Sequence, residues 1–267
     1  MNPYTIGIVC EGPTDSFVLE RLVESIQKNQ NKCLKAVTLA PSEDATTRKT
    51  PPWGWTNVRA WCRQYSAAGG SDGGELARDM GFDHERLKSY SATHSWRALI
   101  AIGQVDGLVI QIDADIAPEI GNGRRAEVDA FDPMRDDRSC YCKNAVLAWL
   151  GEEACTDELY VLVTAYALET WFLALYDKAS NPEMFDTQPA NYQELTNVVE
   201  LLLQAGWGRR KGGISKNIKQ YSRRIEPLLN NLSIVRSRCP ALDDFVQFLL
   251  AKDDCDEECS CKPCSLK

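Results

Sequence analysis

The stretch IGIVCEGPTDSFVLERL, residues 6–22, constrains the fold most. Its apolar run, residues 6–10, is short, continuous and rich in β-branched side chains, which predicts a strand buried on both faces. A Gly-Pro pair follows, and apolar side chains then recur at helical spacing over residues 18–26. A strand, a tight turn and a helix are typical of an open α/β sheet, which binds ligands at the carboxyl ends of its strands. Glu11 is expected at that edge, either as a functional group or as a solvated turn carboxylate.

The composition indicates a globular protein. A chain of 267 residues can bury a sizeable core. No run approaches about 20 consecutive apolar residues and no signal peptide is visible, so we expect no contact with a membrane and a cytoplasmic location. Eleven cysteines without a secretion signal are expected to be reduced thiols. The formal net charge of −8 does not indicate a general nucleic-acid binder, so local charge has to be considered.

Strands and helices alternate in the first part of the chain, and helices dominate from residue 192 onward. The expected strands cover residues 6–10, 36–40, 107–116 and 159–165. This pattern predicts an α/β fold with a mostly parallel sheet flanked by helices and a helical C-terminal part. The expected parts are an α/β domain at 1–178 with a Trp-rich insertion at about 41–93, a helical part at 179–252 and a Cys-rich tail at 253–267.

Two carboxylates end the third expected strand. In extended geometry Asp113 and Asp115 lie on the same side, where they repel each other. A hard divalent cation such as Mg²⁺ resolves that repulsion and bridges to phosphate oxygens, whereas backbone amides in a turn are the alternative partners. If the strands that end at Glu11 and Asp113 are neighbours, three carboxylates meet at one edge. Glu169, after the last expected strand, is a candidate further ligand or an ordinary helix-start glutamate.

A basic segment lies in the C-terminal part. Residues 208–224 carry arginines and lysines with no acidic residue, and their glycines let backbone amides approach a phosphate. The segment is interpreted either as a phosphate-contacting surface or as a solvated helix face. The candidates for nucleic-acid binding are Arg209, Arg210, Lys211, Lys216 and Lys219.

Three motifs carry a family resemblance. VCEGPTD leading into an amphipathic helix, followed by LVIQIDADI, resembles the Toprim domain of topoisomerases, bacterial primases and overcoming-lysogenization-defect nucleases. By that resemblance Glu11 matches the family's glutamate, and Asp113 and Asp115 match its metal-binding pair. YALETW, residues 166–171, is similar to a motif of small single-chain Toprim-like proteins that occur with bacterial mobile-element defence genes. The resemblance covers residues 4 to about 40 and 95 to about 175.

The resemblance implies a Rossmann-like fold and a compact nuclease that uses Mg²⁺ or Mn²⁺ to hydrolyse DNA or RNA. Glu11, Asp113 and Asp115 are then the expected catalytic and metal-binding residues, with Glu169 as a further ligand. The resemblance further implies a role in bacterial anti-phage defence, with an ATPase as partner protein. Assembly into a homo-oligomer is left open. The nuclease hypothesis requires that Glu11 lies close to the aspartate pair and that no basic group fills the space between them.

Two other functions remain open. A Toprim-like scaffold with a degenerate site would bind a partner without catalysis. A glycosyltransferase would use its Asp-x-Asp motif to hold a metal on the diphosphate of a nucleotide sugar, although such enzymes normally lack a carboxylate after the first strand.

The tail CDEECSCKPC is a separate candidate site. It places four thiols within ten residues, enough for a tetrahedral zinc site, and an exposed acidic tail is the alternative. The candidate zinc ligands are Cys255, Cys259, Cys261 and Cys264.

Overall fold

The structure, a computed structural model, describes residues 3–41, 53–66, 95–121, 128–210 and 213–252. Most of the expected insertion, Lys211 and the tail lie outside these residues. The zinc hypothesis for Cys255, Cys259, Cys261 and Cys264 therefore stays a prediction.

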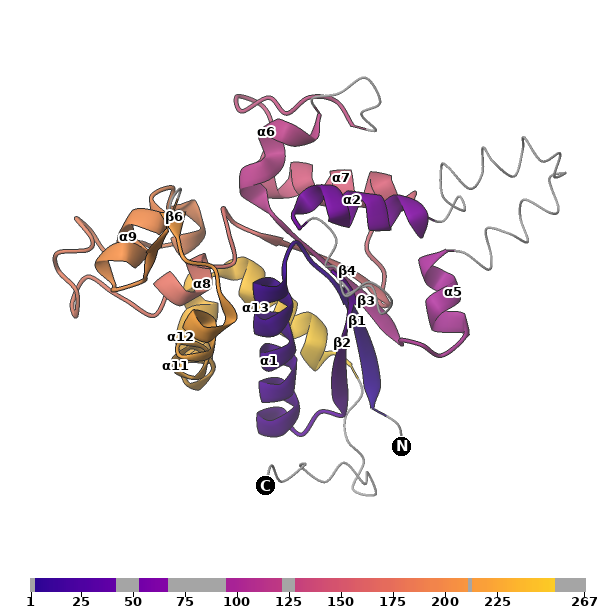
Figure 1. Ribbon diagram of the computed structural model, residues 1–267, viewed down its shortest axis with the longest axis horizontal. Coiled ribbons are helices and arrows are strands. Elements are labelled where there is room, and N and C mark those ends of the chain that lie inside the picture. The colour runs from indigo at the N-terminus through magenta and orange to yellow at the C-terminus, as the bar shows by residue number, and fades with distance from the viewer. Residues whose placement is uncertain (1–2, 42–52, 67–94, 122–127, 211–212, 253–267) are drawn as a thin grey trace, which may run out of the picture.

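A parallel four-stranded sheet forms the centre of the fold, in the order β2-β1-β3-β4 (Figure 1). The strands are β1 (Tyr4–Val9), β2 (Leu34–Ala40), β3 (Gly107–Asp113) and β4 (Leu159–Thr164). Each coincides with an expected strand to within a few residues, so the predicted α/β class with a parallel sheet is confirmed. The register pairs Asp113 with Thr164, which brings the carboxyl ends of β3 and β4 together.

The strands are continuously apolar because both faces of the sheet are covered. Every residue of β3 is buried. Ile8 and Val109 belong to an apolar cluster on one face, whereas Val9 and Ile110 belong to a second cluster on the other. This alternation follows the two-residue period of a strand.

Helices cover the two faces. On one side lies α1 (Pro13–Gln30), which begins with proline in its first turn and ends at Asn31 in the left-handed conformation. The other side carries α2 (Trp55–Gln64) and α7 (Arg138–Leu150), as Figure 1 shows. Trp96 of α5 (Trp96–Ala101) packs into the apolar cluster of that side. None of the helices in the described segments is long and apolar enough to cross a membrane.

The tryptophans of the expected insertion that the structure describes differ in burial. Trp55 stacks on Trp149 of α7 with ring centroids 6.2 Å apart, and Trp61 stacks on Tyr65 at 4.5 Å. Trp53 is 56% exposed. Trp55 and Trp61 therefore contact rings of the protein itself, which favours a packing role over stacking on nucleic-acid bases.

The C-terminal part is helical, as predicted, and packs on the same sheet face as α1. Tyr160 of β4 contacts Phe245 and Phe248 with ring centroids 5.6 and 4.7 Å apart. One apolar cluster runs from β1 and α1 to the last described helix. The small β5–β6 hairpin was not predicted. The elements are α8 (Thr170–Leu173), η2 (Tyr192–Glu194), α9 (Val198–Gln204), β5 (Arg209–Arg210), β6 (Gly213–Ile214), α10 (Ile218–Ser222), α11 (Ile225–Asn230), α12 (Leu232–Arg238) and α13 (Pro240–Leu250).

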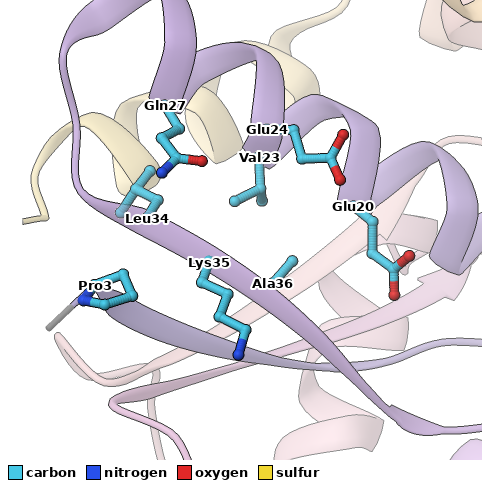
Figure 2. Close-up of a pocket in the computed structure, with 8 residues that line it drawn as sticks. All are labelled: Pro3, Glu20, Val23, Glu24, Gln27, Leu34, Lys35 and Ala36. Carbon is cyan, nitrogen blue, oxygen red and sulfur yellow. The ribbon is translucent and has the colours of Figure 1, made fainter. Parts of the chain in front are cut away.

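A hollow of about 430 Å³ lies between α1 and the first residues of β2 (Figure 2). Val23 and Gln27 line it from the helix, and Lys35 lines it from the strand. It opens near the amino ends of the strands, away from the edge where Glu11 and Asp113 lie. We therefore assign it no part in the site described below.

Candidate acidic site at the carboxyl edge of the sheet

The carboxyl ends of β1, β3 and β4 supply the candidate site. Glu11 follows β1, Asp113 ends β3, and Glu169 follows β4 just before α8. Because parallel strands end at one edge, residues far apart in sequence converge there. The turn after Glu11 starts α1, whose first turn adds Asp15 to the same edge.

Glu11 links β1 to β3. Its Oε1 accepts a hydrogen bond from the backbone N–H of Asp113 at 2.7 Å, and its own N–H donates to Gln111 Oε1 at 3.4 Å. Burial, followed by repulsion from Asp113, raises the pKa of Glu11 from 4.5 to about 8. Glu11 and Asp113 thus lie together, and near neutral pH the Glu11 carboxyl can hold or release a proton.

Asp113 sits in a buried polar network between β3 and β4. Its Oδ1 accepts from Gln111 Nε2 at 2.9 Å and from the hydroxyl of Thr164. Gln111 Nε2 also lies 3.1 Å from Thr164 Oγ1. Burial, followed by repulsion from Asp15, raises the pKa of Asp113 well above its ordinary value. The network fixes the Asp113 carboxylate at the edge of the sheet.

The prediction that Asp113 and Asp115 lie on one side of an extended strand is wrong. The strand ends at Asp113, and Ala114–Ile116 form a 3-10 turn, η1, that leads into α6 (Ala117–Ile120). The two aspartates therefore do not share one side of an extended strand; Asp113 is buried, whereas Asp115 is exposed. The Asp115 carboxylate remains close enough to the cluster to raise the pKa of Glu11.

Glu169 is the most deeply buried acid of this edge, at 2% exposure. Its Oε1 lies 3.0 Å from the ammonium of Lys216 and accepts a hydrogen bond from the hydroxyl of Tyr221. Its Oε2 is buried without a hydrogen-bond partner. The C-terminal part therefore contributes both partners of a carboxylate that belongs to the sheet edge.

The sequence reasoning missed Asp15. It had assigned no site role to this residue, yet Asp15 is 6% exposed and its Oδ1 has no hydrogen-bond partner. Burial, followed by repulsion from Glu169, raises the pKa of Asp15 from 3.8 to about 7. The signal was the spacing: in the first helical turn, four residues after Glu11, a side chain can point back to the edge where the helix starts.

Lys216 occupies an unexpected place. The sequence assigned it to phosphate contact, but its ammonium pairs with Glu169. Burial lowers the pKa of Lys216, and attraction to Glu169 and Asp113 outweighs that effect, so the pKa is raised and the ammonium stays charged. A basic group thus enters the acidic cluster. Glu11 nevertheless contacts the Asp113 backbone directly, and the Lys216 ammonium attracts Glu11 and Asp115 as well as Asp113.

The other basic candidates are exposed. Arg209 and Arg210 lie on β5, and Lys219 lies on α10. Only Arg210 and Lys216 of the described candidates line the hollow beside the acids, which measures about 460 Å³ and is called the side hollow below. Its lining residues are Asp115, Tyr166, Ala167, Glu169, Thr196, Val198, Val199, Arg210, Gly213, Ile214 and Lys216.

A metal ion would need some rearrangement here. In the described part of the chain, no three His, Cys, Asp or Glu side chains are arranged to hold a metal ion as they stand. The donor chemistry nevertheless fits Mg²⁺, which prefers carboxylate oxygens. Asp15 Oδ1 and Glu169 Oε2 are buried oxygens that lack a donor, and such atoms call for a bound ion or water.

Comparison with known proteins adds no assignment. No model of a protein family, no curated protein and no solved structure matches the chain.

Proposed function

We propose that this protein is a nuclease that uses Mg²⁺ or Mn²⁺ to hydrolyse phosphodiesters of DNA or RNA. The observation that carries the proposal is the convergence of Glu11, Asp15 and Asp113 at the carboxyl edge of a parallel sheet, with pKa values raised by burial and mutual repulsion. Mutual repulsion of this kind is what a divalent cation relieves. The resemblance of the EGPTD and DAD motifs to Toprim supports the same chemistry and extends the proposal to anti-phage defence beside a partner ATPase.

The residues have distinct roles in this proposal. Asp113, Asp115 and Asp15 would hold the metal, with Glu169 as a further ligand. Once bound, the metal would supply charge stabilisation at the phosphate oxygens. Glu11, with a pKa of about 8, would carry a proton to or from the reacting oxygens.

Lys216 has a double role in the proposal. Without metal its ammonium partly balances the buried acids. When the acids hold a divalent cation, the like charges repel, and the long flexible side chain of Lys216, 48% exposed, can swing toward a substrate phosphate. The predicted phosphate contact of Lys216 is retained in this form.

A second function is favoured by the same ion pair. A scaffold whose site has lost metal binding would keep Lys216 on Glu169 permanently, and no described group is ready to hold a metal. In this reading the acidic edge stabilises the fold and a surface elsewhere binds a partner.

Metal binding and cleavage separate the two functions. The purified full-length protein is incubated with single- and double-stranded DNA and RNA, in Mg²⁺, Mn²⁺ or EDTA, and Mn²⁺ binding is measured by electron paramagnetic resonance. The nuclease proposal predicts metal-dependent cleavage that Asp113→Asn abolishes and Glu200→Gln, at an exposed position of α9, retains. Absence of both Mn²⁺ binding and cleavage would overturn the nuclease proposal and favour the scaffold function.

A further inference from the structure

The side hollow adjoins the acidic edge on the side of the C-terminal part. Residues of the loop between β4 and α8, of α9 and of the strands β5 and β6 line it. Asp115, Glu169 and Lys216 are among its lining residues, and the Lys216 ammonium lies 3.0 Å from Glu169 Oε1. Its volume of about 460 Å³ lies within the range of sites for small organic groups.

Most of the other residues that line the side hollow are apolar. Val198 and Val199 from α9, together with Ile214 from β6, provide apolar surface, and Arg210 adds a cation. A ligand that fits these residues has a negative group beside Lys216 and the acids, where a metal would sit, and a flat, mostly apolar group against the valines and Ile214. A nucleoside with its phosphate combines a negative group and a flat group in this way.

Tyr166 is the aromatic residue of the side hollow, and it is held in an unusual backbone conformation. Its φ is +55°, a region that non-glycine residues seldom adopt and that is often retained at functional sites. The Arg138 guanidinium lies 5.3 Å from the centroid of its ring. Tyr166 also lines a second hollow of about 280 Å³ with Phe131 and Arg138.

We propose that the side hollow binds the nucleoside of an unpaired nucleotide, with Tyr166 as its stacking surface. This inference rests on the proposed nuclease function, because the phosphodiester of that nucleotide would lie at the acidic edge. In a duplex the bases are stacked inside, so only a base that has left the stack can enter a hollow beside its own phosphate. The preferred substrate class is therefore single-stranded or locally unpaired nucleic acid, in DNA or RNA.

A pair of small esters tests the inference. Thymidine 5′-(p-nitrophenyl phosphate) and methyl p-nitrophenyl phosphate share a leaving group and differ by the nucleoside. Val199→Trp fills the hollow from an exposed helix position, Tyr166→Ala removes the ring, and Glu200→Trp is the matched control on the same helix. With Mn²⁺ and full-length protein, both hollow variants should lower kcat/KM for the nucleoside ester about tenfold to a hundredfold, as loss of base stacking does. Cleavage of the methyl ester should stay unchanged, and Tyr166→Phe should retain activity on both.

The outcomes separate a failure of the nucleoside site from a failure of the proposed nuclease function. If wild type cleaves both esters and the hollow variants lower both equally or neither, the side hollow is not a nucleoside site. If wild type cleaves neither ester, binding of fluorescent oligothymidylate and oligouridylate decides on the hollow, and the nuclease proposal fails only when DNA and RNA are left uncut as well. Weaker binding by Val199→Trp, with Glu200→Trp unchanged, then supports the nucleoside site. Equal binding by both variants, or no binding by wild type, overturns it.

Discussion

Glu11→Gln should stabilise the metal-free protein while it abolishes hydrolysis. Glutamine keeps the oxygen that accepts the Asp113 N–H at 2.7 Å. It removes the negative charge that Asp113 and Asp115 repel. The substitution therefore keeps the hydrogen bond that Glu11 accepts and removes its charge.

The magnitude follows from the pKa of Glu11, which rises from 4.5 to about 8 in the folded protein. Because the folded-state pKa is the higher one, the stability from the protonated carboxyl is present below pH 4.5 and is lost as the pH rises through 8. Each pH unit across this window costs about 1.4 kcal/mol, which amounts to roughly 3 kcal/mol at pH 7. Solvent screening at a partly exposed carboxylate reduces this figure to roughly 2 kcal/mol.

Chemical denaturation in EDTA measures the effect. The free energy of unfolding of Glu11→Gln is compared with wild type at several pH values between about 5 and 9, and Glu200→Gln serves as a control for loss of an exposed charge. The advantage of Glu11→Gln should be smallest at the acidic end and should grow toward pH 8. A variant that is less stable than wild type at pH 8, or whose advantage does not change with pH, would refute the electrostatic account of the site.

Three further changes test other parts of the site. Lys216→Met should lower the free energy of unfolding of the metal-free protein by about 1–3 kcal/mol, because Glu169 loses its cation in a half-exposed pair. In a thermal melt, Mn²⁺ should raise the Tm of this variant more than that of wild type. Asp15→Asn should weaken Mn²⁺ binding at least about tenfold in a titration, and an unchanged affinity would remove Asp15 from the ligand set. Arg210→Ala should reduce the salt dependence of single-strand binding by about 0.7 in the log–log slope, the contribution of one phosphate contact, and Lys219→Ala, outside the side hollow, should show whether that contact is specific.

The central sheet could be predicted because its signal is local. Continuous apolar runs bounded by turns identify strands covered on both faces, and the carboxylates after them follow from the chain direction. Glu11 and Asp113 could be placed at one edge on this basis. The 3-10 turn at Asp115 could not be predicted, because an Asp-Ala-Asp sequence is compatible with both a strand end and a turn.

The partners of the acids could not be read from the sequence. Lys216 and Tyr221 reach Glu169 only because the C-terminal part folds back on the sheet, and no periodicity in their own segment indicates that contact. The burial of Asp15 likewise depends on how α1 packs. Such long-range contacts determine the pKa values of the site, so its chemistry required the tertiary structure.

The apolar cluster shared by β1, α1 and α13 has a consequence for how the acidic edge comes into being. Ribosomal synthesis delivers the carboxylates of the sheet before Lys216 and Tyr221, whose segment must dock to complete the core. Until the C-terminal part docks, the acids lack the ammonium of Lys216, and the sheet face that α13 covers is exposed to water. Charge balance at the edge thus depends on the same docking that buries this face of the sheet.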